Sequence, residues 1–149
     1  MNIAVYIKDF IYKFGGTESY TANLIESLQK ILNNPNITIL TEYYKKTVPL
    51  TEQKLINTLN DAYGVEITEK NVKIKYIQSK ENKNRLDSFK FQLSINKFTK
   101  NYDLFFYCSK GMLTGNAKKN IAIIHFPMDK KESFPTYKKY PFLKFIAKK

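Results

Sequence analysis

Cysteine is almost absent from this chain, because Cys108 is the only one among its 149 residues. A lone cysteine cannot form a disulfide within the chain, which excludes the disulfide framework of small secreted domains and fits a reducing compartment. We therefore expect a cytoplasmic protein. Cys108 ends an apolar run, so we expect its thiol to be packed in the core.

Long apolar runs are missing as well, since no stretch approaches the roughly 20 apolar residues that a membrane-spanning helix needs. The first apolar run is short and is followed at once by Lys8 and Asp9, so it does not have the form of a secretory signal. From these two absences we expect neither a membrane-spanning protein nor a secreted one.

The glycine fingerprint of dinucleotide-binding oxidoreductases, G-x-G-x-x-G, is also absent. The chain does begin with an apolar run and a glycine pair, Gly15 and Gly16. Residues 8–14 separate the two, however, whereas the fingerprint turns tightly after its strand. No Asp or Glu is evident at the strand end where such enzymes bind the ribose. These departures disfavour a dinucleotide-dependent oxidoreductase.

Acidic residues are scarce in the second half of the chain. Residues 1–66 contain 6 Lys and 7 Asp or Glu, whereas residues 67–149 contain 18 Lys, Arg85 and 6 acids, so the excess behind the formal charge of +12 lies wholly in the second part. Such an excess favours an anionic partner, namely phosphates, a membrane surface or nucleic acid. A lysine-rich proteome with solvated lysines would give the same balance.

What the chain does contain is a regular alternation of short apolar runs and helical stripes, with 43% hydrophobic residues, enough for the core of one domain. We expect strands over residues 2–7, 37–41, 72–77, 103–108 and 121–127, the last one buried. We expect helices from Gly15 to Asn33, with positions 24, 25, 28, 31 and 32 on one face, and from Thr51 to Gly64, with these two residues as caps.

Residues 85–101 fit two kinds of secondary structure. Phe89, Phe91, Leu93 and Ile95 alternate like a strand, but Phe89 and Leu93 also share one face of a helix, and Phe91 and Ile95 share the opposite face. A strand here would leave only a short link to the strand at residues 103–108. We therefore predict a helix that is apolar on two sides.

The alternation predicts an α/β fold, a Rossmann-like parallel sheet with helices on both faces. The strand of residues 2–7 should be central, with those at 103–108 and 121–127 on one side of it. Ligands of such sheets bind beyond the carboxyl ends of the strands, which brings residues 8–17, residues 109–111 and His125 to one edge. His125 is the only histidine. A lone histidine at a strand end is usually structural, but its place at this edge makes it a candidate site residue.

Gly15, Gly16 and Thr17 open the first long helix. The first amides of a helix have no partners within it and carry partial positive charge, and glycine lets a phosphate approach the backbone closely. The loop is therefore a candidate anion site. A glycine pair is also a common turn signal, and that interpretation stays open on the motif alone.

The strand, the loop Gly15-Gly16-Thr17-Glu18 and the helix that follows resemble the opening of family 4 glycosyltransferases with the GT-B fold. Two further pieces are similar to elements of that family. Tyr102-Asp103 with its apolar strand matches the family's Tyr-Asp strand, and Ile124-His125-Phe126-Pro127 matches its strand-end His-x-Pro element. The resemblance covers nearly the whole chain but less than half of such an enzyme.

The resemblance implies that residues 1–149 are a single Rossmann-like, acceptor-side N-terminal domain, itself truncated, of a retaining glycosyltransferase whose C-terminal nucleotide-sugar domain is absent here. It implies a nucleotide-sugar donor, a glycan or lipid-linked acceptor, a role in cell-surface polysaccharide or glycolipid synthesis, and no metal or other cofactor. His125 would be the catalytic residue that orients the donor sugar. The substrate-binding residues would be Gly15, Gly16, Thr17, Ser109 and Lys110.

Glu18 belongs to the same motif, but we interpret it as a first-turn acid favoured by the helix dipole rather than as a base. A different class stays open, a basic module with a Rossmann-like fold that binds nucleic acid or a membrane surface. Lysines interleave with Tyr and Phe after Lys70, which would suit phosphates and stacked bases, but no recognised nucleic-acid motif is present. We expect no specific nucleic acid as partner, and a basic half that favours peripheral contact with an anionic membrane at its inner face.

Overall fold

The computed structural model describes residues 1–8, 15–44, 49–80, 84–108 and 115–123. Strands and helices alternate along these residues as far as the fourth strand, as the sequence predicts, and the fifth strand is the next described element. They are β1 (Asn2–Ile7), α1 (Gly16–Ile31), β2 (Asn36–Tyr43), α2 (Glu52–Tyr63), β3 (Val72–Gln78), α3 (Arg85–Thr99), β4 (Leu104–Cys108) and β5 (Lys119–Ile123). Residues 85–99 are thus helical, which confirms the prediction made for that segment.

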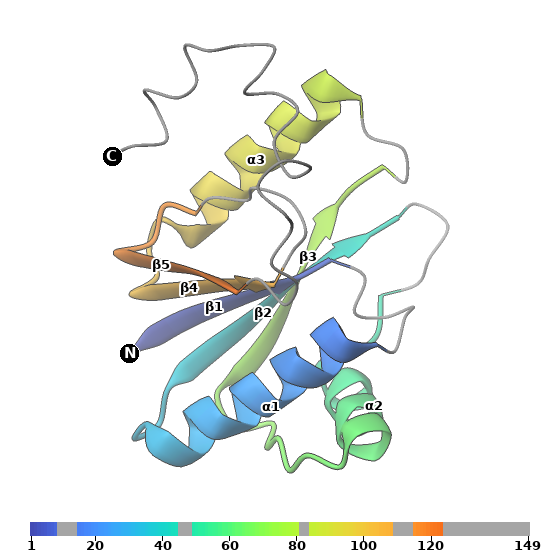
Figure 1. Ribbon diagram of the computed structural model, residues 1–149, viewed down its shortest axis with the longest axis vertical. Coiled ribbons are helices and arrows are strands. Elements are labelled where there is room, and N and C mark those ends of the chain that lie inside the picture. Colours follow the sequence, from blue (N-terminus) through green and yellow to red (C-terminus); the bar gives the residue numbers. More distant parts are fainter. Residues whose placement is uncertain (9–14, 45–48, 81–83, 109–114, 124–149) are drawn as a thin grey trace, which may run out of the picture.

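The five strands form one all-parallel sheet in the order β3-β2-β1-β4-β5 (Figure 1). β1 is central, and β4 and β5 lie on one side of it, as predicted. Ile7 at the end of β1 is opposite Thr41 of β2 and Cys108 of β4, and Cys108 is in turn opposite Ile123 of β5. β1, β4 and β5 therefore end at the same level, and β2 and β3 continue two residues beyond it. The chain leaves β1, β4 and β5 at one edge of the sheet.

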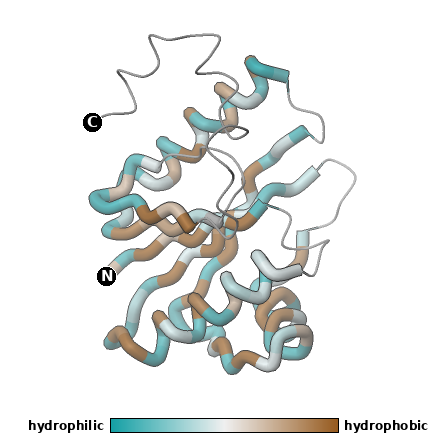
Figure 2. Tube along the Cα trace, viewed as in Figure 1, coloured by the Kyte–Doolittle hydropathy of each residue, from teal (hydrophilic) through white to brown (hydrophobic). Residues whose placement is uncertain are grey.

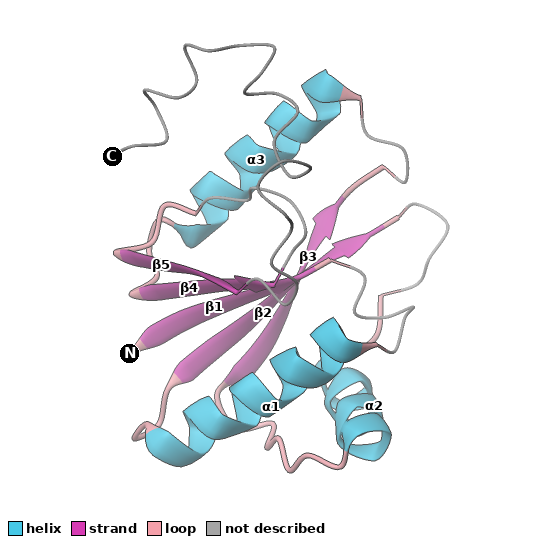
Figure 3. Cartoon of the chain, in the orientation of Figure 1, coloured by secondary structure: helices cyan, strands magenta, loops and turns pink. Residues whose placement is uncertain are grey.

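Helices cover both faces of the sheet, with α1 and α2 on one face and α3 on the other (Figure 3). Successive residues of a strand point to opposite faces, so β1 supplies Ile3, Val5 and Ile7 to the core under α1 and α2, and Ala4 and Tyr6 to the core under α3. All five are buried, which is why this strand is a nearly continuous apolar run. Figure 2 shows hydrophobic segments gathered along the central strands.

Both predicted caps of α2 are present. The Thr51 hydroxyl accepts a hydrogen bond from the Lys54 amide at 3.3 Å. At the other end, Gly64 has φ +64°, a left-handed conformation that glycine adopts without steric cost.

Two segments are less buried than their apolar residues suggest. Ile31 belongs to the apolar face predicted for α1, but it is 79% exposed. Because a helix turns by about 100° per residue, Ile31 lies well away from Thr21 and Ile25, which face the sheet. The buried strand predicted over residues 121–127 begins instead at Lys119; its residues 119–122 are exposed and Ile123 is half-buried, while residues 124–127 lie outside the described residues. In the described part of the sheet β5 is an edge strand, with only β4 as a neighbour.

Candidate functional site

The candidate site lies at the carboxyl edge of the sheet, where the chain leaves the strands. Lys8 is exposed at the end of β1, and its carbonyl oxygen accepts a hydrogen bond from the Glu42 amide at 3.3 Å. Gly15, Gly16 and Thr17 follow at the start of α1. The structure thus brings the predicted glycine motif to this edge. The other predicted site residues, Ser109, Lys110 and His125, lie outside the described residues.

Among the described residues, the first turn of α1 has free space beside it. Gly15 is the extended N-cap residue and, as a glycine, supplies no side-chain cap. Gly16 is exposed, and a Cβ atom added to it would meet no atom within 4 Å. Thr17 is half-buried, and its carbonyl oxygen accepts a hydrogen bond from the Thr21 hydroxyl at 2.8 Å. This geometry leaves room for an anion at a helix start, where the dipole and the first amides favour negative charge.

One carboxylate already lies at this helix start. Glu18 is the third residue of α1, a position from which a glutamate can fold back over the N-cap. Its Oε2 atom would be 2.8 Å from a Cβ atom built on Gly15, so the carboxylate lies beside the glycine. The helix dipole favours a negative side chain here. A bound anion would therefore have to share the helix start with Glu18.

Tyr63, the last residue of α2, adds an aromatic hydroxyl to the site. It is half-buried, and its hydroxyl interacts with the backbone of Gly15. Burial raises the pKa of Tyr63, and the negative charge of Glu18 raises it further. Sequence reasoning missed this residue, because only the packing of α2 against α1 brings it to the glycine motif.

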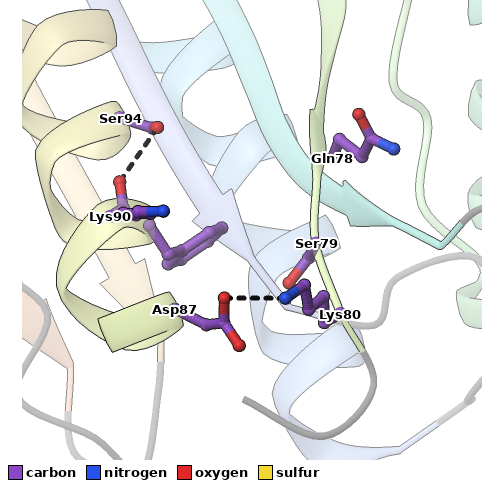
Figure 4. A pocket seen from close by; sticks show the side chains of 7 residues that line it. Gln78, Ser79, Lys80, Asp87, Lys90 and Ser94 are labelled. Atoms are coloured by element: carbon purple, nitrogen blue, oxygen red, sulfur yellow. Dashed lines mark hydrogen bonds and ion pairs between the residues drawn. The ribbon is translucent and has the colours of Figure 1, made fainter. Parts of the chain in front are cut away.

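A second feature of the same edge is a hollow of about 350 Å³ between the end of β3 and the first turns of α3 (Figure 4). Its volume is within the range of small-molecule sites, about 300–1,000 Å³. The lining residues come from only these two elements and the link that follows β3. They are Gln78, Ser79, Lys80, Asp87, Lys90, Phe91 and Ser94.

Six of the seven lining residues are polar or charged, although the exposed lining surface is mostly apolar, and two of the charged residues form an ion pair. Lys80 Nζ lies 2.9 Å from Asp87 Oδ1, and this hydrogen bond lowers the pKa of the Asp87 carboxyl. Asn84 caps α3 by accepting a hydrogen bond from the Asp87 amide at 2.8 Å. The Ser79 amide donates to the Tyr43 carbonyl at 3.0 Å. The Ser79 hydroxyl is buried and has no hydrogen-bond partner among the residues that the structure describes, although buried polar atoms usually have one.

Beneath the hollow lies a buried carboxylate. The Tyr6 hydroxyl of β1 donates a hydrogen bond to the Glu42 carboxylate of β2, and both side chains are buried. The centre of the Tyr6 ring is 6.1 Å from that of Phe91, which lines the hollow. Glu42 is not exposed to solvent, so it supports the packing of Tyr6 and Phe91 rather than contacting a ligand. Sequence reasoning missed Glu42 because the strand was expected to end at Thr41, although Leu40 and Glu42 keep the period of two that places them on one face.

Within the described ranges, no group of three or more His, Cys, Asp or Glu side chains is arranged to hold a metal ion. The same residues include no helix that is both long enough and apolar enough to cross a membrane.

Comparison with known proteins finds no match for this chain among protein-family models, curated proteins or solved structures.

Proposed function

We propose that this chain is the acceptor-side N-terminal domain of a retaining glycosyltransferase of the GT-B type. The observation that carries the proposal is the position of the glycine motif. Gly16 begins α1 directly after the link from β1, the central strand, so the motif lies at the carboxyl edge of a parallel sheet. The resemblance to family 4 glycosyltransferases requires the motif at this place.

In this proposal the first turn of α1 stabilises negative charge. Backbone amides near Gly16 face the diphosphate of the donor or a phosphate of the acceptor, and the Thr17 hydroxyl adds a contact. Fixed donors of this kind act on charge that develops during the reaction, without having to reorganise. His125 orients the donor sugar by a hydrogen bond, a role assigned from the sequence resemblance.

The hollow beside α3 is a second binding place for a polar acceptor. The Ser79 hydroxyl and the Gln78 amide offer hydrogen bonds, and Lys90 offers a positive charge. The side chain of Phe91 supplies an apolar floor for the face of a sugar ring. These groups fit a sugar or a sugar phosphate better than an apolar molecule.

Catalysis by this fold needs a second wall that holds the nucleotide. Without it, the donor lacks the groups that orient its leaving phosphate, and proximity gains of about 7–11 kcal/mol cannot be realised. Water would also reach the reacting carbon. We therefore expect residues 1–149 alone to bind a substrate weakly and to transfer no sugar.

The test is a titration of ¹⁵N-labelled protein with a panel of nucleotide sugars, with inorganic pyrophosphate and with sugar phosphates, followed by amide chemical shifts. Pyrophosphate and the nucleotide sugars should shift the amides of Gly16 and Thr17. Sugar phosphates should shift Ser79 and Lys90. Shifts confined to surfaces away from both places, or no shifts at all, would contradict the proposal.

A further inference from the structure

α3 has an exposed apolar face. Leu86, Phe89 and Leu93 are 60%, 61% and 51% exposed. Their spacings of three and four residues place them on one side of the helix. Phe91 and Ile95 occupy the opposite side and are buried against the sheet. Three large apolar side chains on one exposed face are more than the scattered exposure that is normal on a protein surface.

Basic side chains border this face. Lys90 follows Leu86 by four residues and Lys97 follows Leu93 by four, so each lies one turn further along the same side of α3. Arg85 begins the helix, and Asp87, its only acid, is paired with Lys80. We call Leu86, Phe89, Leu93, Lys90 and Lys97 the outer face of α3.

The other layer of the molecule has the opposite charge. α1 and α2 together carry four acids, Glu18, Glu26, Glu52 and Asp61, and two lysines, Lys30 and Lys54. Lys30 is paired with Glu26 at 3.0 Å. α3, with one arginine, two lysines and one acid, lies across the sheet from α1 and α2 (Figure 1), so the helices on the two faces of the described fold differ in charge.

We infer that the outer face of α3 docks on an anionic membrane surface. A helix that lies in the plane of a membrane buries an apolar stripe among the lipids, while Lys and Arg beside it meet the anionic headgroups. The long lysine side chains can extend their charges to the headgroups while their methylene stems lie along the apolar stripe. α3 has both properties on one side, and the acidic layer of α1 and α2 lies on the side away from the membrane.

Other occupants fit this face less well. A symmetric pair of chains would bring Lys90 and Lys97 of both copies together, which like-charge repulsion opposes. Nucleic acid would use the lysines, but it offers no apolar surface to Leu86, Phe89 and Leu93. A bilayer surface satisfies the apolar and the charged side chains together.

Membrane docking deepens the proposed function, because the hollow lined by Asp87, Lys90 and Phe91 lies beside the first turns of the same helix. A docked α3 would bring the hollow to the lipid surface, where the headgroup of a lipid-linked acceptor is found. The binding test below uses no nucleotide sugar, so its outcome is independent of whether the protein takes part in sugar transfer.

The chain contains no tryptophan, so one substitution supplies a unique fluorescent reporter. Phe89→Trp places it on the outer face of α3, and Ile31→Trp places it on α1, where Ile31 is 79% exposed. With vesicles of equal parts phosphatidylcholine and phosphatidylglycerol, we expect a blue shift of emission at position 89 and none at position 31. Phosphatidylcholine alone should give a much smaller shift. An unshifted emission at position 89 would overturn the inference.

Charge and apolar variants separate docking from simple adsorption. Phe89→Asp should weaken binding to the mixed vesicles by about tenfold or more, since the Phe side chain no longer enters the lipid, and Ile31→Asp should leave it unchanged. Lys97→Glu should weaken it by about fivefold or more, and Lys54→Glu on α2 should not. Equal effects of each variant and its control would overturn the inference, because vesicle binding would then not depend on the outer face of α3.

Two further outcomes assign the face to another occupant and also overturn the inference. Emission at position 89 that is blue-shifted without vesicles, and more so at higher protein concentration, would show that a second copy covers it. Oligonucleotide binding that is lost in Lys97→Glu, with vesicle binding intact, would show that the face serves nucleic acid. Circular dichroism of each variant checks that the helices remain folded.

Discussion

The Glu18 carboxylate lies beside Gly15, with Oε2 2.8 Å from the place where a Cβ atom would stand. The carboxylate therefore places a negative charge beside the start of α1. The helix dipole attracts anions, while the carboxylate beside the N-cap repels them. The strength of any anion site here is the difference between these two effects.

Removing the Glu18 charge should strengthen anion binding. Glu18→Gln keeps the size and most of the shape of the side chain, but it ends the repulsion of a phosphate beside Gly15. Two unit charges about 4 Å apart in water repel by about 1 kcal/mol, so the affinity for pyrophosphate should rise by about fivefold. Isothermal titration measures it. Weaker binding in the variant would instead make Glu18 a ligand contact.

The same substitution should lower the pKa of Tyr63. Burial raises the pKa of this phenol most, a hydrogen bond with the Gly15 backbone lowers it, and the charge of Glu18 raises it, so Glu18→Gln removes the smallest of the three effects. We expect the pKa to fall but to stay above its ordinary value. A pH titration of the Tyr63 ring signals by NMR checks this. An unchanged pKa would show that Glu18 does not lie close to the Tyr63 hydroxyl in solution.

A matched pair of variants at Gly16 measures the contribution of its backbone amide to anion binding. Gly16→Pro removes the amide donor at the first helical position, where proline is tolerated, and the extended Gly15 suits the residue before a proline. Gly16→Ala keeps the donor, and the space around a Cβ atom is open. Pyrophosphate affinity should fall about tenfold more in the proline variant, since hydrogen bonds to charged groups contribute about 1.5–3 kcal/mol. Equal losses would mean that the amide does not bind the anion.

The Lys80–Asp87 pair should contribute to stability except in acid. The hydrogen bond from Lys80 lowers the pKa of folded Asp87 below 3.8, its ordinary value. The contribution is therefore present above that value and is lost as the pH falls through the lowered pKa. Asp87→Asn should lower the free energy of unfolding near neutral pH. On acidification, the variant should lose less of this free energy than the wild type does. Urea unfolding at several pH values tests this, with Asp61→Asn on α2 as control. Identical pH profiles for wild type and Asp87→Asn would contradict it.

Local patterns in the sequence predicted most of the fold. The apolar runs placed the strands, and Thr51 and Gly64 predicted the ends of α2 because caps depend on neighbouring residues. Local pattern alone did not predict the helix at residues 85–99, since its residues also fit a strand. The order of strands and helices along the rest of the chain favoured the helix.

What the sequence missed depends on packing between distant elements. Tyr63 reaches Gly15 only when α2 packs on α1, and Glu42 finds Tyr6 only across two paired strands. The exposure of Ile31 follows from how α1 lies on the sheet, which its own apolar stripe does not determine. The glycine motif was predictable because its residues are adjacent in the chain.

The catalytic role proposed for His125 depends on the sequence resemblance alone. In the open reading frame that contains this chain, His125→Ala should reduce the turnover of sugar transfer by about tenfold to a hundredfold, as expected for the loss of a hydrogen bond worth about 1–3 kcal/mol. The midpoint of urea unfolding should change little. A parallel loss of turnover and of stability would assign His125 a structural role.

The proposed function has this chain supply one of the two walls of a glycosyltransferase. The most direct measurement compares residues 1–149 with the protein from the whole open reading frame, each incubated with a panel of nucleotide sugars and of sugar or lipid-phosphate acceptors. We expect the whole protein to transfer a sugar with retained anomeric configuration, and residues 1–149 alone to show no sustained turnover. Multiple turnovers by residues 1–149, or no transfer from any donor by the whole protein, would contradict the account.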